Sequence, residues 1–256
     1  MKKIKQKLPE ISLIYPAYNE AGNIEEAIRQ AQKVLPKIAK KFEIIVVNDG
    51  SKDLTLQIVK RITEKDKNIV VVNQRNKGYG GAIKSGFKKA KFEWLFFTDS
   101  DLQFDLEEIE NFVPYHEDYQ LILGFRKNRA EGKKRKLLAD MLKIWNYTIL
   151  GFPREIKDID CAFKLFNQKV LKTIQPINSN GAMVSTEFLL KAHLAGFKYK
   201  QIGVTHYQRN VGNPTGSNLK VIIKAVIDTF ILKKQILTSD FKSNLKEIKA
   251  KFRYNF

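Results

Sequence analysis

The segment WLFFTDSD, Trp94–Asp101, decides the fold class of this 256-residue chain. Trp94–Thr98 carries no charge and is followed at once by Asp99 and Asp101. A short, continuously apolar run of this kind is typical of a strand that is buried on both faces. We therefore expect a buried strand that ends in two carboxylates.

Three similar runs precede this segment, and amphipathic stretches separate them. The expected strands are Ile11–Tyr15, Glu43–Asn48 and Ile69–Asn73. The expected helices are Ile24–Leu35, with Asn23 as a candidate N-cap, Asp53–Asp66 and Ala82–Ala90. Apolar strands that alternate with helices indicate parallel pairing with both faces covered. The sequence thus predicts a doubly wound α/β fold with a mainly parallel sheet flanked by helices.

The second half of the chain is less regular. Gln120–Phe125 is expected to form a further strand, and Leu137–Leu150 and Leu219–Leu237 to form amphipathic helices. We expect a main domain over residues 1–215 and a basic amphipathic helical extension over residues 216–256. Each amphipathic helix could lie in a membrane interface or be buried in the core or a dimer.

The charge balance points to anionic partners. The chain has 46 Lys and Arg against 27 Asp and Glu, a formal net charge of +19. Such an excess favours nucleic acid, phosphorylated small molecules or an acidic membrane surface. The oligomeric state is not indicated.

The cysteine count and the hydropathy indicate in which cellular compartment the protein is expected. One cysteine, Cys161, excludes an intramolecular disulfide and a cysteine-based zinc site, so a reducing, cytoplasmic setting is expected. The basic start MKKIKQKLPEI lacks a following apolar stretch, and no 18-residue apolar run occurs. We therefore expect neither a signal peptide nor a membrane span.

The ends of the expected strands carry acidic and amide groups. Parallel strands bring their carboxyl ends to one edge of the sheet, where ligands bind in such folds. Asp99 and Asp101 could there hold Mg²⁺ or Mn²⁺ between protein and phosphate oxygens, with Gln103 as a neutral oxygen nearby. The alternative is a solvated turn whose aspartates cap a helix at Leu106–Val113.

Several motifs occur together and in a fixed order. They are PAYNE (Pro16–Glu20), VVNDGSKD (Val46–Asp53), NKGYGGAIKSGFKKA (Asn76–Ala90), TDSDLQ (Thr98–Gln103), GFR (Gly124–Arg126) and DIDCAFKLF (Asp158–Phe166). Over roughly residues 8–215 the chain resembles the family 2 inverting glycosyltransferases of the GT-A fold. It is most similar to the dolichyl- and undecaprenyl-phosphate sugar transferases. Asn48 departs from the Asp that many members carry there.

The resemblance implies a role for each motif. Pro16, Tyr18 and Glu20 should border the nucleotide and Asp49 should contact its base. Asp99 and Asp101 should face the diphosphate and the metal, with Gln103 completing the metal site. Arg209 resembles the family's late arginine near the donor diphosphate.

For several other residues the sequence allows two different roles. Gly78 begins a turn whose backbone amides could approach a donor phosphate, or it simply starts a helix. Arg126 and Arg135 are candidates for binding an acceptor phosphate, and each could instead be a surface charge. Asp158 and Asp160 could provide a base for a hydroxyl acceptor, whereas an ionised phosphate needs no strong base. The candidate catalytic residues are Asp101, Arg126, Asp158 and Asp160.

The function expected from these residues is metal-dependent, inverting transfer of a sugar from a UDP- or GDP-sugar to a polyprenyl phosphate. The alternative acceptor is a hydroxyl of a growing surface glycan. A nucleic-acid-binding protein is a different class, and no zinc-finger or RRM signature supports it. The expected location is the cytoplasmic face of an anionic membrane, as a peripheral protein.

Overall fold

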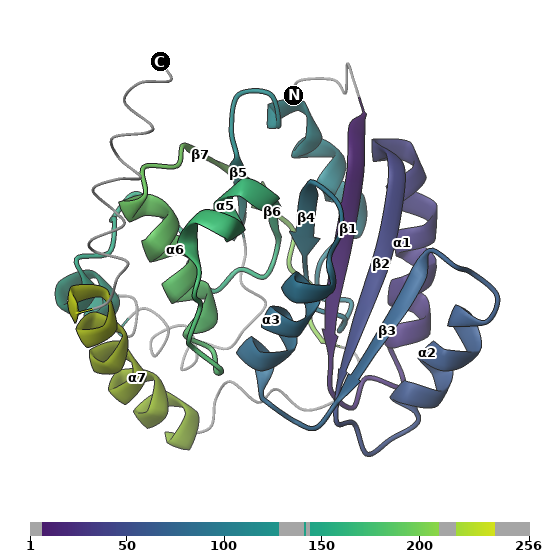
Figure 1. Ribbon diagram of the computed structural model, residues 1–256, viewed down its shortest axis with the longest axis horizontal. Helices are drawn as coiled ribbons and strands as arrows, with labels where there is room; N and C mark the ends of the chain where they lie inside the picture. Colours follow the sequence, from purple (N-terminus) through teal and green to yellow (C-terminus); the bar gives the residue numbers. More distant parts are fainter. Residues whose placement is uncertain (1–6, 128–140, 142–143, 210–218, 239–256) are drawn as a thin grey trace.

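The computed structural model describes residues 7–127, 141, 144–209 and 219–238, without the side chains of 219–225 and 237–238. The described residues form a seven-stranded sheet with the order β3-β2-β1-β4-β6-β5-β7 (Figure 1). The strands are β1 Leu8–Ala17, β2 Ala39–Asp49, β3 Ile69–Gln74, β4 Trp94–Phe97, β5 Leu121–Arg126, β6 Lys164–Asn167 and β7 Tyr199–Val204. The helices are α1 Ile24–Ile38, α2 Thr55–Thr63, α3 Tyr79–Lys89, α5 Gln168–Ile174, α6 Val184–Leu194 and α7 Leu219–Thr238, with 3₁₀ turns η1 Leu106–Asn111 and η2 Val113–Tyr115.

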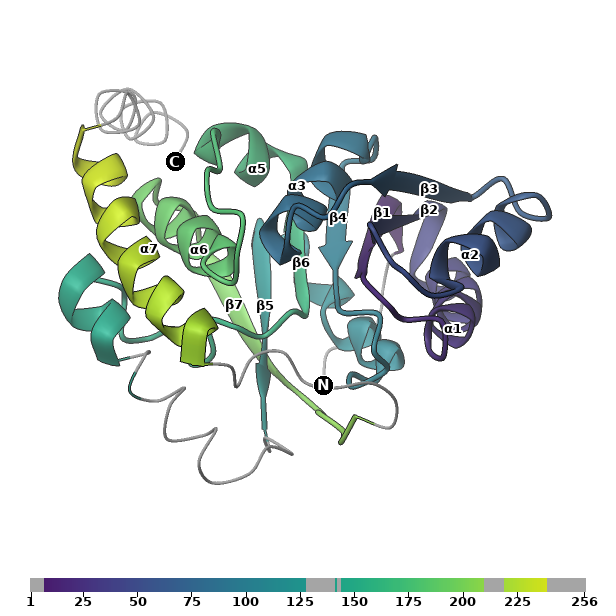
Figure 2. The same ribbon diagram turned by 90° about the horizontal axis from the view of Figure 1, so that it is seen from below.

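The predicted α/β fold is confirmed. β1 pairs in parallel with β2 and β4, β2 pairs in parallel with β3, and β5 pairs in parallel with β7. β6 runs antiparallel to both of its neighbours, β4 and β5. α1 and α2 cover one face of the sheet, and α3, α5 and α6 cover the other (Figure 2).

The sequence of β4 is apolar throughout because the strand is packed in the core on both faces. Phe97 contacts Phe87 of α3 and Phe166 of β6, with ring centroids 5.8 and 6.3 Å apart. Its neighbour Phe96 contacts Phe163, at 4.7 Å. Successive side chains of a strand point to opposite faces, so both layers of the core meet at this strand. The acids that follow it are thus attached to one of the most firmly packed parts of the fold.

Most predicted boundaries differ from the structure by a few residues. α1 continues past Leu35 through Pro36 to Ile38, and α2 begins at Thr55 rather than Asp53. The side chain of Asn23 makes no capping hydrogen bond, and its amide donates instead to Glu20 Oε2 over 2.7 Å. The expected helix at 106–113 forms two 3₁₀ turns, of which η1 is capped by Asp105.

α7 and the helical residues 144–150 lie side by side (Figures 1 and 2). Trp145 and Phe230 are in edge contact at 5.5 Å, and Leu232 of α7 packs on Met183. The helix expected at 219–237 is confirmed, whereas 137–140 and 142–143 lie outside the described residues. In the described part of the chain, none of the helices combines the length and the apolar character that a membrane span requires.

Candidate active site at the carboxyl edge of the sheet

The carboxyl ends of β1, β2, β3 and β4 meet at one edge of the sheet, because these strands are parallel. The loop after β1 is joined to the loop after β2. Asn19, at φ 56°, accepts from the Lys52 amide over 2.8 Å, and its own amide donates to Ser51 Oγ over 3.0 Å. The Glu20 amide donates to Thr55 Oγ1 over 2.8 Å. These bonds fix the backbone on both sides of Glu20.

Asp49 lies at the end of β2 and is almost fully buried. Its Oδ1 accepts from Gln74 Nε2 over 2.7 Å and from the Lys77 amide over 2.8 Å. Gln74 is held in turn by Ser85 Oγ, at 2.6 Å. Asp49 is therefore oriented by α3 and β3. Nearby, Asn48 donates to Asn73 Oδ1 over 2.7 Å.

Asp99 and Asp101 follow β4 on a turn in which Leu102 has φ 61° and Ser100 Oγ donates to Pro16 O over 2.9 Å. Tyr79 OH donates to Asp99 Oδ1 over 2.9 Å, and the Gln103 amide donates to Asp101 Oδ1 over 3.2 Å. Burial, and then the charge of Asp101, raise the pKa of Asp99 to about 7. A carboxyl whose charged form is disfavoured by burial and by a neighbouring carboxylate is well suited to bind a cation.

Arg209 joins the first and fourth strand ends. Its Nη2 is paired with Glu20 Oε1, and its Nη1 lies 3.5 Å from Asp101 Oδ2. Burial raises the pKa of Glu20, although Asn23 and Arg209 act in the opposite direction. The structure thus places Arg209 against the acids at this edge of the sheet.

The residues at this edge fit a hard divalent cation with few protein ligands. No cluster of three or more His, Cys, Asp or Glu suited to a metal occurs in the described ranges. Mg²⁺ and Mn²⁺ can bind through one or two carboxylates and fill the remaining positions with substrate phosphates and water. Gln103 Nε2 donates a hydrogen bond to Tyr207 O over 2.9 Å. This bond engages the amide nitrogen, so the amide oxygen Oε1 is the atom that could bind a metal ion.

Arg126, at the end of β5, forms a bidentate ion pair with Asp158. In the sheet, β5 lies on the side of β4 opposite to β1. Arg126 Nε lies 2.7 Å from Asp158 Oδ2, and Nη2 lies 2.9 Å from Oδ1. The two side chains are only 9% and 5% exposed. The pair raises the pKa of Arg126 above its ordinary value, against the opposite effect of burial. Asp160 is exposed, and Arg135 lies outside the described residues.

The glycines at the start of α3 have a structural use. Gly78 has φ 77° and begins the helix. The amides of Gly80 and Gly81 both donate to Asn180 O, over 2.9 and 3.3 Å. These two donors are therefore engaged within the protein, which favours the helix-entry reading over the phosphate cradle for them.

Sequence reasoning missed two polar groups close to the acids. The motif that contains Tyr79 does not indicate a role for its side chain. Lys164 is fully buried, and its Nζ donates to the carbonyls of Ile159 and Cys161 and lies 5.2 Å from the Phe97 ring. Burial lowers the pKa of Lys164. Both residues lie in the sequence motifs, but a motif does not show the direction in which a side chain points.

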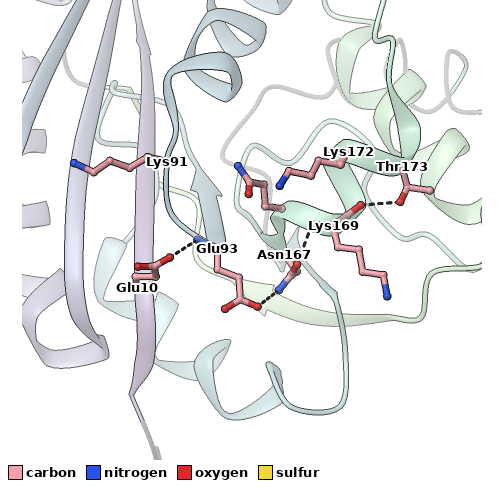
Figure 3. A pocket seen from close by; sticks show the side chains of 8 residues that line it. Glu10, Lys91, Glu93, Asn167, Lys169, Lys172 and Thr173 are labelled. Carbon is pink, nitrogen blue, oxygen red and sulfur yellow. Dashed lines mark hydrogen bonds between the residues drawn. The ribbon is translucent and has the colours of Figure 1, made fainter. Parts of the chain in front are cut away.

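A groove of about 390 Å³ lies at the opposite edge of the sheet, among residues that include Glu10, Lys91, Glu93, Asn167 and Lys172 (Figure 3). Glu10 is near the amino end of β1, and Glu93 immediately precedes β4. Its walls carry charges of both signs, and none of the motif acids lines it. Ligands of such sheets bind at the carboxyl ends, so the acidic edge remains the candidate site.

Comparison with known proteins agrees with this fold. Glucosyl-3-phosphoglycerate synthase from Mycobacterium tuberculosis, solved with Mn²⁺, UDP-glucose and phosphoglyceric acid, is 20% identical, with a TM-score of 0.61 over 88% of this chain and 79% of that one. TarS residues 1–349 from S. aureus, solved with UDP-GlcNAc, is 18% identical, with a TM-score of 0.61 over 95% of this chain and 71% of that one. These likenesses show the GT-A fold.

Curated relatives are similar over much of the chain. Glycosyltransferase AglD of Haloferax volcanii is 30% identical over 204 residues, 76% of this chain and 32% of that protein. Undecaprenyl-phosphate 4-deoxy-4-formamido-L-arabinose transferase of Proteus mirabilis is 26% identical over 220 residues, 85% of this chain and 66% of that protein. The chain therefore spans about one third to two thirds of the length of these relatives.

The family model described as glycosyl transferase family 2 matches residues 12–175, which hold both the strand-end loops and the acid pair after β4. This match covers more than half of the chain, and on that basis the chain belongs to glycosyl transferase family 2.

Proposed function

We propose that this chain is a metal-dependent, inverting glycosyltransferase that moves a sugar from a UDP- or GDP-sugar to a polyprenyl phosphate. The observation that carries the proposal is the cluster of Glu20, Asp99, Asp101 and Arg209 at the carboxyl edge of the sheet. The name of the Proteus mirabilis relative, an undecaprenyl-phosphate sugar transferase, supports the choice of acceptor.

The donor half of the proposed site extends from Asp49 to Asp101. Asp49, which Gln74 and the Lys77 amide hold in place, is the proposed contact to the base, and Tyr18, 43% exposed immediately after β1, is a proposed aromatic border of the nucleotide. Pro16 and Gly78 complete the proposed donor border. Mg²⁺ or Mn²⁺ held by Asp99, Asp101 and Gln103 would offset the charge that develops on the departing diphosphate. Mn²⁺ accompanies UDP-glucose in the solved structure of the mycobacterial synthase.

Arg126 is the proposed acceptor-phosphate residue, with Arg135 as a second proposed contact. Asp158 holds the guanidinium of Arg126 through two hydrogen bonds, which orients it and keeps its plane fixed. An ionised phosphate oxygen attacks the anomeric carbon as the bond to the diphosphate breaks, and no protein base is required. Asp158 therefore acts best as the group that orients Arg126.

Transfer to a sugar hydroxyl is the second candidate reaction. It is favoured by one observation, the exposed carboxylate of Asp160 on the same turn as Asp158, because a hydroxyl acceptor needs a base. Asp160→Asn separates the two candidates. It should leave transfer to a lipid phosphate nearly unchanged and should abolish transfer to a hydroxyl.

The direct test is transfer of radiolabelled sugar to an extractable lipid. The protein is incubated with Mn²⁺, a UDP- or GDP-sugar and undecaprenyl or dolichyl phosphate, and label is counted in the organic phase. Label that depends on both metal and lipid phosphate supports the proposal. A parallel incubation replaces the lipid phosphate with a soluble glycan. Label in that glycan and none in lipid supports the hydroxyl acceptor, and donor binding without transfer to either contradicts both acceptors.

The proposed location is the cytoplasmic face of an anionic membrane. Exposed apolar side chains lie on α7 and the adjoining helix, and Lys233 and Lys234 are exposed beside them. Apolar groups bordered by lysine favour a lipid surface. We do not propose nucleic acid as a partner, since the site is built around paired carboxylates.

A further inference from the structure

The first turn of α3 contacts the acid pair through Tyr79. Its phenol donates to Asp99 Oδ1 over 2.9 Å. Burial and the neighbouring Asp99 raise the pKa of Tyr79 well above its ordinary value, so the phenol stays protonated and remains a donor. A donor fixed on one oxygen of Asp99 limits how that carboxylate can rotate and leaves Oδ2 for another ligand.

The position of Tyr79 is set by a loop that we call the strap, residues 178–181. Asn180 O accepts the amides of Gly80 and Gly81, and Lys84 Nζ donates to Asn178 O and Asn180 Oδ1 over 3.2 and 2.6 Å. A Cβ at Gly80 would lie 2.8 Å from the carbonyl carbon of Asn180. The strap and α3 can thus approach this closely only because residue 80 is glycine.

The strap is anchored in turn by a buried ion pair. Glu187 accepts the amides of Asn178 and Ser179, over 2.8 to 3.1 Å, and its Oε1 lies 2.7 Å from Lys191 Nζ. Both side chains of the pair are at most 3% exposed. Burial acts to raise the pKa of Glu187, but Lys191 and the strap amides outweigh it and lower that pKa. Glu187 is therefore a charged, satisfied anchor with no contact to the acid pair.

We propose that Tyr79 is a positioning residue for the metal site, that it sets the orientation of Asp99, and that the strap sets the position of Tyr79. This inference rests on the proposed metal-dependent function. Groups that hydrogen-bond to metal-ligating side chains fix ligand geometry, and their loss commonly weakens metal binding by about 10- to 100-fold.

The test is Mn²⁺ affinity, measured from the electron paramagnetic resonance signal of free Mn²⁺ with UDP and, in parallel, with GDP. Tyr79→Phe removes only the hydroxyl and should weaken Mn²⁺ binding by about tenfold. Tyr15→Phe is the matched control. Its phenol is also buried and donates to Ala27 O over 3.2 Å, but on the opposite face of the sheet, so Mn²⁺ affinity should not change.

A second variant tests the strap. Gly80→Ala should push the strap and the first turn of α3 apart and weaken Mn²⁺ binding through Tyr79. The double variant with Tyr79→Phe should then bind Mn²⁺ no more weakly than Tyr79→Phe alone, since both changes act on one contact. Independent, additive losses would overturn the role of the strap.

The outcomes separate the inference from the function on which it rests. Wild-type protein that binds Mn²⁺, an Asp101→Ala variant that does not, and a Tyr79→Phe variant with wild-type affinity would overturn the role of Tyr79 and leave the proposed function intact. A wild-type protein without Mn²⁺ binding in the presence of either nucleotide would contradict the proposed function itself.

Discussion

Asp99 and Asp101 face different surroundings although they are two residues apart. Asp99 is bonded to a neutral phenol, whereas Asp101 lies next to the guanidinium of Arg209. A carboxyl with a raised pKa is destabilised in its charged form, and a bound cation removes that cost. If the acid pair holds the proposed metal, the cost of its charge in the metal-free fold is recovered on binding.

Asp101→Ala should abolish metal-dependent donor binding and leave the fold intact, because Asp101 is a proposed metal ligand on a turn rather than part of the core. The measurement is the rise in Tm on adding UDP- or GDP-sugar with Mn²⁺, since ligands that bind the native state raise Tm. The circular dichroism spectrum of the variant serves as the control for folding. An undiminished Mn²⁺-dependent rise would show that the metal is held elsewhere.

Asp99→Asn should stabilise the metal-free protein, more so at pH 8 than at pH 5. The pKa of Asp99 is raised from 3.8 to about 7, so its contribution to stability is greatest below pH 3.8 and is lost as pH rises through 7. The gap in Tm between variant and wild type should widen by about 7 °C between the two pH values, equivalent to about 2.5 kcal/mol. Thermal melts in EDTA measure it, and a gap that narrows at pH 8 would contradict the raised pKa.

Asp158→Asn should lower stability by about 3 kcal/mol, because it leaves the buried charge of Arg126 without its counter-ion. Denaturant unfolding measures the loss. Glu26→Gln is the matched control. Its pair with Arg29 is a surface pair and should contribute at most about 1 kcal/mol. A loss at Asp158 no larger than that of the control would mean that the pair is hydrated in solution.

At the scale of elements, Gly86 determines how closely α3 packs on the sheet. A Cβ there would lie 2.3 Å from Ile14 Cγ2. Gly86→Ala should therefore destabilise the protein by about 1–3 kcal/mol through overpacking, although the same change in an exposed helix stabilises by about 1 kcal/mol. Denaturant unfolding gives the sign. Adding Ile14→Ala should make the combined loss smaller than the sum of the single losses.

The elements of the first half could be predicted because each β-strand there is a continuous apolar run between helical patterns. In the second half, β5 and α7 were also predicted, but β6, α5, α6 and β7 were not. β6 is short and contains the buried Lys164, whose charge is met by backbone carbonyls that lie within the DIDC turn. α6 is buried almost all round, including Glu187 and Lys191, so it has no polar face to mark its period.

The candidate site, too, could be predicted only in part from the sequence. The motifs placed Asp99, Asp101 and Arg209 in one region, and the structure brings them together. The pairing of Arg126 with Asp158, and the use of the glycine amides by Asn180, depend on contacts between segments far apart in the chain. Such pairings follow from the packing of the whole sheet and are not encoded in any single motif.

At the scale of the whole molecule, the net charge of +19 and the exposed apolar residues of two adjacent helices favour the same partner. Met141, Ile144, Ile227, Phe230 and Ile231 are exposed large apolar residues on α7 and the helix beside it. An apolar surface of this kind on a basic protein favours insertion into the headgroup region of an anionic membrane.

We predict that the protein floats with vesicles containing phosphatidylglycerol and phosphatidylcholine and not with phosphatidylcholine alone. Binding should weaken as salt rises from 0.05 to about 0.5 M, because the lysine contribution is screened while the apolar contribution remains.

Replacing Ile227 and Phe230 with Ser should reduce flotation several-fold at any salt concentration. These side chains are at least half exposed, so the substitution should change Tm little, which serves as its control. Equal binding to neutral vesicles would show that charge plays no part. Unchanged binding by the double variant would place the membrane contact on another surface.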